Sequence, residues 1–387
     1  MDARLASLVL ALPLACGCGG GGGGGSPASP TASTPTAPAT TTTTTTTPAA
    51  AATAGTAFFY QDVGIGGNSV RAGITTDGRN ITSYNSSVLR WTLPSATGVY
   101  ADAVFSRLSN GRWVMAAATT LTDPRGALAL QIHESSCPAV TDANVKVLGR
   151  SSASGCENAG ALAMGKHSQV FEVNGSRYMF GMTNSRVILM RLTDATRGIA
   201  NLSSICVRRT AATTLSELAW GEATTVLDSA RAPGLFLSDT AIARRTDGTW
   251  VLFVKGIASN NGCTEASLCE LCARGIYRST STDLINWSTP ERVVSQASVP
   301  DAYTAPDGRV WLYWQDFGPA CTAQNVQLAG RAPIRGAPES DFTASAPVSI
   351  PGEAFEANTN LHYPTNGNPV LLPDAAATAA FNACFGR

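Results

Sequence analysis

The chain has 387 residues with 27 basic and 27 acidic side chains, so no net charge attracts it to nucleic acid or anionic lipid. Only 14% of the residues are charged, while glycine, serine, threonine and alanine are abundant, a composition typical of short strands and tight turns. After the first 15 residues no apolar run approaches the roughly 18 residues that a membrane span requires. These properties argue against a nucleic-acid partner and predict a soluble body.

The N-terminus has the pattern of an export signal, with Arg4 before the apolar run 5–14 and Ala15-Cys16 after it. The pattern resembles a bacterial lipoprotein signal, in which the cysteine is lipidated after cleavage. The resemblance implies a signal over residues 1–18, Cys16 as the lipidated residue, and a place in the bacterial cell envelope as an outer-membrane lipoprotein. The lipid would then be the only membrane contact. Ordinary secretion is the alternative.

Residues 19–54 have the composition of a tether. They comprise a glycine run and a stretch of proline, alanine, serine and threonine that includes eight consecutive threonines at 40–47. Such a composition cannot bury a core. We therefore expect a single folded domain over residues 55–387, present as a monomer.

Eight of the ten cysteines lie in this domain, and an even number in an exported chain predicts disulfides. They are Cys137, Cys156, Cys206, Cys263, Cys269, Cys272, Cys321 and Cys384. Cys269 and Cys272 form a CxxC pair, which could be half of a zinc site. Because no second CxxC exists and the chain has three histidines, the disulfide interpretation is favoured and no metal is expected there.

From residue 54 onward, short runs of Val, Ile, Leu, Tyr and Trp alternate with Asn-Gly and Asp-Gly turns, without sustained helical periodicity. This pattern predicts an all-β fold. One unit recurs: an acid, a turn glycine nine residues later, and then a Trp-containing strand. Asp102 with Gly111 and Asp239 with Gly248 share this spacing, and looser copies begin at His167, Asp301 and Asn360.

Five units at intervals of 59 to 72 residues predict a five-bladed β-propeller with four-stranded antiparallel blades. The innermost strand of each blade would begin at the axis with the head residue of its unit. The last unit, with its turn at Asn366-Gly367, ends near Pro373, whereas Ser69–Asp77 is a strand without a partner. We therefore expect N-terminal strands to complete the fifth blade and close the ring.

The head acids, the Asp-Gly and Asn-Gly hairpins, the aromatic strands and the turn 281–287 (STDLINW) resemble the five-bladed propeller of glycoside hydrolase family 43 and its relatives. The resemblance spans residue 54 to the C-terminus. It implies an axial funnel in which one Asp is a general base, a second Asp tunes and orients, and a Glu is the general acid. Asp102 matches the base. The second and third blades offer Lys166 or His167, and Asp239, in place of the expected Asp and Glu.

Inverting hydrolysis of a glycosidic bond requires a proton donor and a base on opposite sides of the sugar, about 6.5 to 9.5 Å apart. We expect Asp102 as base, Asp239 as proton donor and Asp301 as a like charge that raises the pKa of one of them. The expected substrate-binding residues are His167, Asn360 and His362. His167 could instead hold an axial cation such as calcium, and no other cofactor is expected. The alternative for each head acid is structural: it would accept backbone N–H bonds from a neighbouring blade.

Three loop glutamates, Glu157, Glu217 and Glu222, are alternative sources of the missing acid, although a solvated surface position is the default for each. Four tryptophans on second strands are assigned to packing between blades. They are Trp113, Trp250, Trp311 and Trp314. The turn 281–287 is expected to be structural. The functional alternative to hydrolysis is a non-catalytic surface module that binds glycan or protein in the same funnel.

Overall fold

The computed structural model describes residues 54–64, 67–89, 100–120, 128–138, 147–150, 169–183, 186–191, 224–228, 230–258, 272–323, 332–351 and 363–387. Within these ranges the chain forms five four-stranded antiparallel sheets, each with its strands in simple order. The fold is a five-bladed β-propeller, as the repeat predicts. None of the described helices is both long enough and apolar enough to cross a membrane.

We number the blades along the chain from the first complete repeat. Blade 1 contains β4 (Tyr100–Arg107), β5 (Trp113–Thr120), β6 (Leu128–Ser135) and β7 (Val147–Arg150), and blade 2 contains β8 (Gln169–Val173), β9 (Ser176–Thr183), β10 (Arg186–Arg191) and β11 (Thr224–Leu227). Blade 3 contains β12 (Leu235–Arg244), β13 (Trp250–Ala258), β14 (Arg274–Ser281) and β15 (Glu291–Ser295). Blade 4 contains β16 (Ala297–Thr304), β17 (Val310–Asp316), β18 (Ile334–Pro338) and β19 (Ala346–Pro347).

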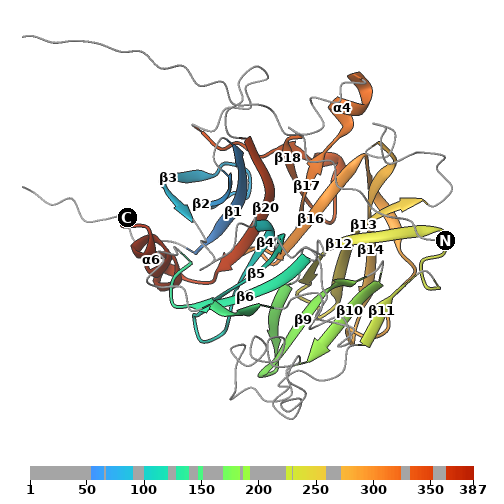
Figure 1. Ribbon diagram of the computed structural model, residues 1–387, viewed down its shortest axis with the longest axis horizontal. Helices are drawn as coiled ribbons and strands as arrows, with labels where there is room; N and C mark the ends of the chain where they lie inside the picture. The colour runs from blue at the N-terminus through green and yellow to red at the C-terminus, as the bar shows by residue number, and fades with distance from the viewer. Residues whose placement is uncertain are drawn as a thin grey trace, which may run out of the picture. The chain divides into compact units, whose positions relative to one another are not determined.

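Blade 5 joins the two ends of the domain. Its order is β20 (Tyr363–Leu372), β1 (Gly55–Gly64), β2 (Gly67–Thr75) and β3 (Thr82–Leu89), so the prediction that N-terminal strands close the ring is confirmed. In Figure 1 the strands β20, β4, β16 and β12 lie toward the middle, and β3 and β11 lie toward the periphery. Neighbouring first strands contact one another around the ring: β20 with β4 and β16, β4 with β8, and β12 with β16.

The predicted hairpin at Asn366-Gly367 is wrong. Both residues lie inside β20, where they form a bulge opposite Tyr60 of β1. A turn is not needed here because the hydrogen-bonding partner of β20 arrives from the other end of the chain. Glycine is needed for another reason: a Cβ on Gly367 would stand 2.5 Å from the Phe58 ring.

The other Asp-Gly and Asn-Gly predictions are confirmed as hairpin turns. In blade 3 the Arg245 N–H donates to the Thr249 carbonyl and the Gly248 N–H to the Arg245 carbonyl. Blades 1 and 4 repeat this pair of bonds, and the turn glycines at 111, 248 and 308 have φ of 82°, 90° and 81°. Glycine adopts this left-handed region without the steric cost that a Cβ imposes.

The core lies between neighbouring blades. On β13, Trp250, Leu252 and Val254 pack toward blade 2, whereas Val251 and Phe253 pack toward blade 4. Successive side chains of a strand point to opposite faces, so a second strand that is covered on both faces reads as a continuous apolar run. The four tryptophans assigned to packing are all buried, which confirms that assignment.

The turn 281–287 is structural, as expected. Asp283 accepts the N–H groups of Ile285 and Asn286, while the Trp287 Nε1–H donates to the Leu284 carbonyl. The turn 75–80 in blade 5 has the same bonds around Asp77. The residue after the aspartate has a left-handed conformation in both turns: Gly78 has φ 72°, and Leu284 has φ 67°.

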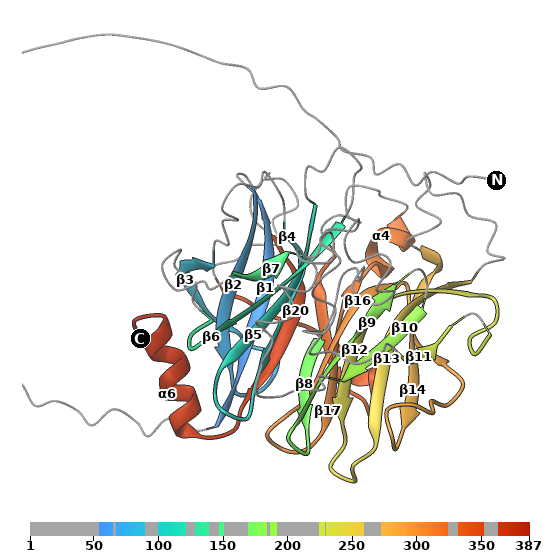
Figure 2. The ribbon, with the colours of Figure 1, turned by 60° about the horizontal axis from the view of Figure 1, so that its bottom comes forward.

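Sequence analysis predicted no helix, and the longest described helix lies at the C-terminal end of the domain. The helix α6 (Ala375–Cys384) begins at Asp374, whose side chain accepts the Ala377 N–H, and buries Phe381 against Phe59 and Trp113. Figures 1 and 2 show it beside the blade of β1 to β3. Its signal is an N-cap Asp before an alanine-rich run, which is too short and too weakly amphipathic to stand out as a periodic pattern.

Two disulfides are present in the described part, in agreement with the prediction from the cysteine count. Cys137 is bonded to Cys384 of α6, and Cys272 to Cys321 of the short helix α4 (Gly318–Ala323). The second thiol of the CxxC pair is therefore used in a disulfide. The remaining four domain cysteines lie outside the described residues.

Candidate functional site at the propeller axis

The first strands of four blades carry a bulge, which contains the predicted head acid in blades 1 and 3 but not the predicted head residue in blades 4 and 5. One extra residue stands in β4 between Ala101 and Val104, in β12 between Ser238 and Thr240, and in β16 between Ser298 and Asp301. The bulge in β20 at residues 366–367 completes the set. A bulge re-aims its side chain relative to the regular pleat, and bulges are frequent next to active sites. The bulge thus recurs in the first strands of these blades, as the unit of acid, turn glycine and aromatic strand recurs in the sequence.

Asp239 is the extra residue of the bulge in β12. It lies in the middle of that strand rather than at its start, in a left-handed conformation with φ 46° that a residue with a Cβ rarely adopts. Its side chain is 5% exposed and forms an ion pair with the Lys255 Nζ of β13. A neighbouring ammonium group favours the ionised form of a carboxylate. The ion pair therefore argues against the predicted role of Asp239 as proton donor.

The register of the β12–β13 hairpin explains why Lys255 lies near Asp239. A regular hairpin that pairs Arg244 with Trp250 places residue 255 opposite residue 239, and the bulge shifts Lys255 to a pairing with Ser238. The same position in blade 1, opposite Ala101, holds Ala118, which carries no charge. The position that carries Lys255 in blade 3 is therefore occupied by an uncharged residue in blade 1.

Asp301 is also buried, at 5% exposure, and its Oδ1 accepts the N–H of Ala302 at 2.9 Å. It is not the equivalent of Asp239, because the bulge in β16 comprises Val299 and Pro300. Val299 has φ 52°, close to the 46° of Asp239. The shorter spacing of seven residues between Asp301 and Gly308 reflects this offset of two positions along the strand.

The remaining predicted site residues are placed only in part. Asp102 lies in the β4 bulge, but its side chain is outside what the structure describes. All the other candidates fall outside the described residues. They are His167, Asn360 and His362, together with Lys166, Glu157, Glu217 and Glu222. Within the described part, no group of three or more His, Cys, Asp or Glu side chains could hold a metal ion.

Other side chains perform the structural task that was the alternative for the head acids. The Oδ1 of Asn368 in β20 accepts the N–H of Phe105 in β4 at 2.7 Å, and the Oε1 of Gln169 in β8 accepts the N–H of Ile242 in β12 at 3.2 Å. The first strand of each sheet is an edge, so its outward backbone groups need partners when they are buried. These two bonds between blades each satisfy one such backbone N–H.

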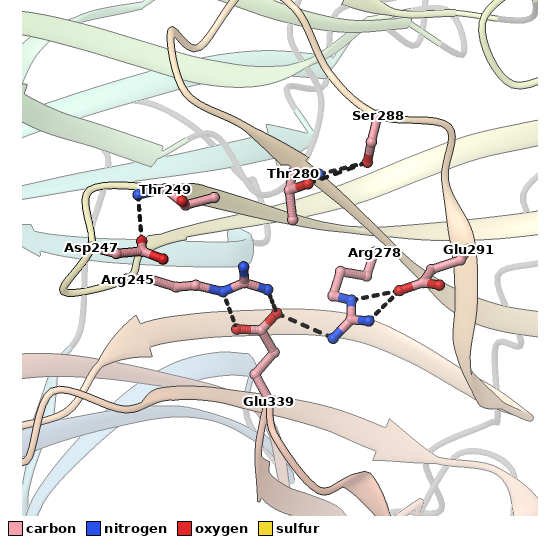
Figure 3. Close-up of polar contacts among 8 residues, drawn as sticks. All are labelled: Arg245, Asp247, Thr249, Arg278, Thr280, Ser288, Glu291 and Glu339. Atoms are coloured by element: carbon pink, nitrogen blue, oxygen red, sulfur yellow. Dashed lines mark hydrogen bonds and ion pairs between the residues drawn. The ribbon is translucent and has the colours of Figure 1, made fainter.

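A second polar cluster joins blades 3 and 4 at the hairpin side. Figure 3 shows the Glu339 carboxylate between Arg245 and Arg278, with Glu291 on the far side of Arg278. Glu339 is 8% exposed and accepts the Arg245 Nε–H at 2.9 Å and an Arg278 N–H at 3.2 Å. The hydrogen bonds that Arg245 donates to the Glu339 carboxylate raise the pKa of Arg245. Sequence reasoning missed this cluster because its members are up to 94 residues apart.

Comparisons with known proteins return fold-level likeness alone. The sequence matches no protein-family model, and the comparison with curated proteins finds no match. The structure is similar to an exo-1,5-α-L-arabinanase from a bovine ruminal metagenomic library (12% identity, 69% of this chain and 85% of that chain, TM-score 0.45). It is also similar to a glycosyl hydrolase from Bacteroides ovatus (12% identity, 76% of this chain and 82% of that chain, TM-score 0.45). A third similar structure is the native arabinanase of Bacillus subtilis (11% identity, 73% of this chain and 90% of that chain, TM-score 0.44). The propeller assignment itself follows from the order of the sheets.

Proposed function

We propose that this protein is an exported, carbohydrate-active propeller of the glycoside hydrolase type, with its substrate bound at the axis beside the bulges of the first strands. The observation that supports this proposal is the pair of buried carboxylates on adjacent first strands, Asp239 on β12 and Asp301 on β16. Aspartate is rarely buried without a structural or chemical need. Asp239 is held by its ion pair with Lys255, and Asp301 accepts the Ala302 N–H, so both carboxylates are fixed in position on their strands.

The proposed reaction is inverting hydrolysis. The carboxylate of Asp102 takes a proton from water, whose oxygen attacks the anomeric carbon while the bond to the leaving oxygen breaks. The carboxylic acid of Asp301, the other buried acid on a first strand, gives its proton to that oxygen. Asp239, kept ionised by Lys255, binds sugar hydroxyls and stabilises positive charge at the anomeric carbon. His167, Asn360 and His362 remain proposed substrate contacts.

The test is hydrolysis of aryl glycosides, arabinan and xylan by the wild type and by Asp102→Asn, Asp239→Asn and Asp301→Asn. We expect losses in kcat of about 10²-fold or more for Asp102→Asn and Asp301→Asn, since each removes a proton-transfer group. Asp239→Asn should raise KM as well. Asp307→Asn, in the exposed hairpin turn of blade 4, is the matched control and should retain full activity. Unchanged activity in the three axial variants would rule out these roles.

A non-catalytic glycan- or protein-binding module is the second candidate. The Asp239–Lys255 pair favours it, because a buried ion pair can orient a ligand but does not supply a proton. Calorimetric titration with arabinan and xylan oligosaccharides distinguishes the two. Saturable binding by a wild-type protein that produces no reducing ends would select the binding module and exclude hydrolysis of the sugars tested.

We also propose that the chain reaches the cell envelope through lipidation of Cys16. The order of an apolar run, a small residue and a cysteine supports this proposal. Wild-type protein should incorporate labelled palmitate and sediment with membranes, whereas Cys16→Ser should do neither. Cys18→Ser is the matched control and should retain the label.

A further inference from the structure

A cavity of about 400 Å³ occupies the opposite end of the propeller axis from the bulges. Every blade contributes to its wall from its first strand, blades 1, 3, 4 and 5 from the last part of that strand and blade 2 from most of β8. Examples of lining residues, one from each of blades 1 to 5 in order, are Arg107, Glu172, Arg244, Thr304 and Leu371. We call it the turn-end cavity, because the first hairpin turn of blades 1 to 4 follows directly. Its volume falls in the range of small-molecule sites.

The turn-end cavity lies further along the first strands than the predicted hydrolytic site, with its lining beginning at Ile242 on β12 and at Ala302, next to Asp301, on β16. Arg244 follows Asp239 by five residues on β12, and Arg107 follows Asp102 by five residues on β4. At a rise of about 3.3 Å per residue, five residues of strand span about 16 Å. Neither Asp239 nor Asp301 lines the cavity.

Two guanidinium groups give the wall its charge. The Arg244 group lies 5.3 Å from the centre of the Trp250 ring, and its Nε–H donates to the Gly248 carbonyl at 3.2 Å, so it is held in place. Arg107 occupies the same register position in blade 1, opposite Trp113. The Arg107 guanidinium forms no ion pair and no hydrogen bond with another described residue.

The cavity's one acidic lining residue does not neutralise these arginines. Glu172 accepts the Ser109 N–H at 2.6 Å and pairs with the Arg177 Nε at 3.2 Å. Burial raises the pKa of Glu172, but the Ser109 hydrogen bonds and Arg177 outweigh that effect and lower it. Its charge is therefore matched by Arg177, and the two wall arginines face no further carboxylate among the described lining residues.

An unpaired hydroxyl lies in the same wall. Ser106 lines the cavity and is 9% exposed, and its Oγ has no hydrogen-bond partner in the described part. A buried hydroxyl without a partner costs roughly 1 to 3 kcal/mol, which a bound polar group at this wall would reduce. Phe171, Trp250 and Tyr303 supply aromatic surface nearby.

We propose that the turn-end cavity binds an acidic monosaccharide, with its carboxylate on Arg107 and Arg244 and its ring against the aromatic wall. Arginine matches a carboxylate with two parallel N–H bonds, and an aromatic face suits the apolar face of a sugar ring. The site is independent of the hydrolytic proposal, because it uses none of the bulge residues.

The experiment is calorimetric titration of the purified full chain with D-galacturonate, D-galactose and inorganic phosphate. D-galacturonate should bind with one site per chain and at least about tenfold more tightly than the neutral sugar. Equal binding of both sugars, or no binding of D-galacturonate, would overturn the proposal. Phosphate that binds as tightly as D-galacturonate would show that the site recognises an oxyanion alone, which would overturn the assignment of a sugar.

Variants locate the binding in the turn-end cavity. Arg107→Gln and Arg244→Gln should each weaken D-galacturonate binding by about tenfold, whereas Arg292→Gln on the outer strand β15 removes the same charge and should have no effect. Arg244→Lys keeps the charge and the fold but loses the two-pronged geometry, so it should also bind more weakly than the wild type. Wild-type affinity in Arg107→Gln and Arg244→Lys, with unchanged unfolding midpoints, would refute the site. Asp102→Asn should bind D-galacturonate normally, which separates this result from any failure of the hydrolytic proposal.

Discussion

Asp77 is kept ionised by its own turn. Burial raises its pKa, but the N–H groups of Asn80 and Arg79 and the Asn80 side chain outweigh that effect and lower it to about 2. Asp283 has the same set of donors, and its pKa is lowered too, chiefly by the Asn286 N–H. A carboxylate in this turn thus stabilises the turn through hydrogen bonds to residues next to it in the sequence. Asp239 instead forms its ion pair with a lysine of the next strand.

The lowered pKa of Asp77 predicts a pH dependence of stability. A group whose pKa falls on folding stabilises the protein above its unfolded value, near 3.8, and that contribution is lost as the pH falls toward about 2. Asp77→Asn should therefore lower the urea midpoint at pH 6, and the gap to the wild type should close between pH 4 and pH 2. A gap that stays constant over this range would contradict the assignment.

The Glu339 cluster predicts a large effect of one buried charge. Glu339→Gln leaves Arg245 and Arg278 close together without their shared carboxylate. Breaking a fully buried ion pair costs roughly 3–5 kcal/mol, and we expect about 2 kcal/mol here because both arginines are partly exposed. Urea unfolding measures this change. Glu291→Gln removes the 60% exposed partner of Arg278 and should cost less than about 1 kcal/mol.

At the scale of elements, each second strand of a blade is covered on both faces. On β17, Val310, Leu312 and Trp314 pack toward blade 3, whereas Trp311 and Tyr313 pack toward blade 5. The helix α6 adds a comparable cover at the outside of blade 5, where the Asn382 Oδ1 accepts the Tyr84 hydroxyl at 2.6 Å. A short helix is marginal alone, so tertiary packing must provide its stability.

The docking of α6 can be tested at its anchor. Phe381 is 1% exposed and contacts the rings of Phe59, Tyr84 and Trp113. Phe381→Ala should cost about 3–5 kcal/mol in urea unfolding, because it removes a large side chain from a packed core. Ala380→Ser, at an exposed position of the same helix, should cost less than about 0.5 kcal/mol. Similar costs for the two variants would show that α6 does not anchor the blade.

At the scale of the whole molecule, blade 5 holds the ring closed. β20 reaches β2 and β3 only through β1, which pairs with β20 on one side and β2 on the other. Residues separated by more than 300 positions in the sequence thus complete one sheet. Closure leaves no first strand without neighbouring blades on both sides, which limits exposed edges.

Truncation tests this closure. A chain of residues 49–387 should unfold cooperatively at the same urea midpoint as the full chain, because the described strands begin at Gly55. A chain of residues 66–387 lacks β1 and should lose cooperative unfolding and aggregate, since β20 and β2 then expose unpaired edges. Size-exclusion chromatography and urea unfolding report both effects. A monomeric, cooperative 66–387 chain would show that closure is dispensable.

The sequence by itself determined the features that depend on local spacing. The turn glycines, the alternation of strands and turns, the repeat of the unit and the closure by N-terminal strands were all predicted, because each follows from residues a few positions apart or from a count of units. The tryptophan packing and the structural turn 281–287 follow for the same reason. The disulfides followed from the number of cysteines, whereas their pairing did not.

Only the tertiary structure decided which residues meet. It placed Lys255 against Asp239, shifted Asp301 two residues beyond the bulge, and turned Asn366-Gly367 from a hairpin into a bulge beside Phe58. A bulge of one residue shifts the pairing of all residues that precede it in the strand. The spacing of residues in the sequence does not reveal where such a bulge occurs. The turn-end cavity likewise exists only because five strands from distant parts of the chain end around one axis.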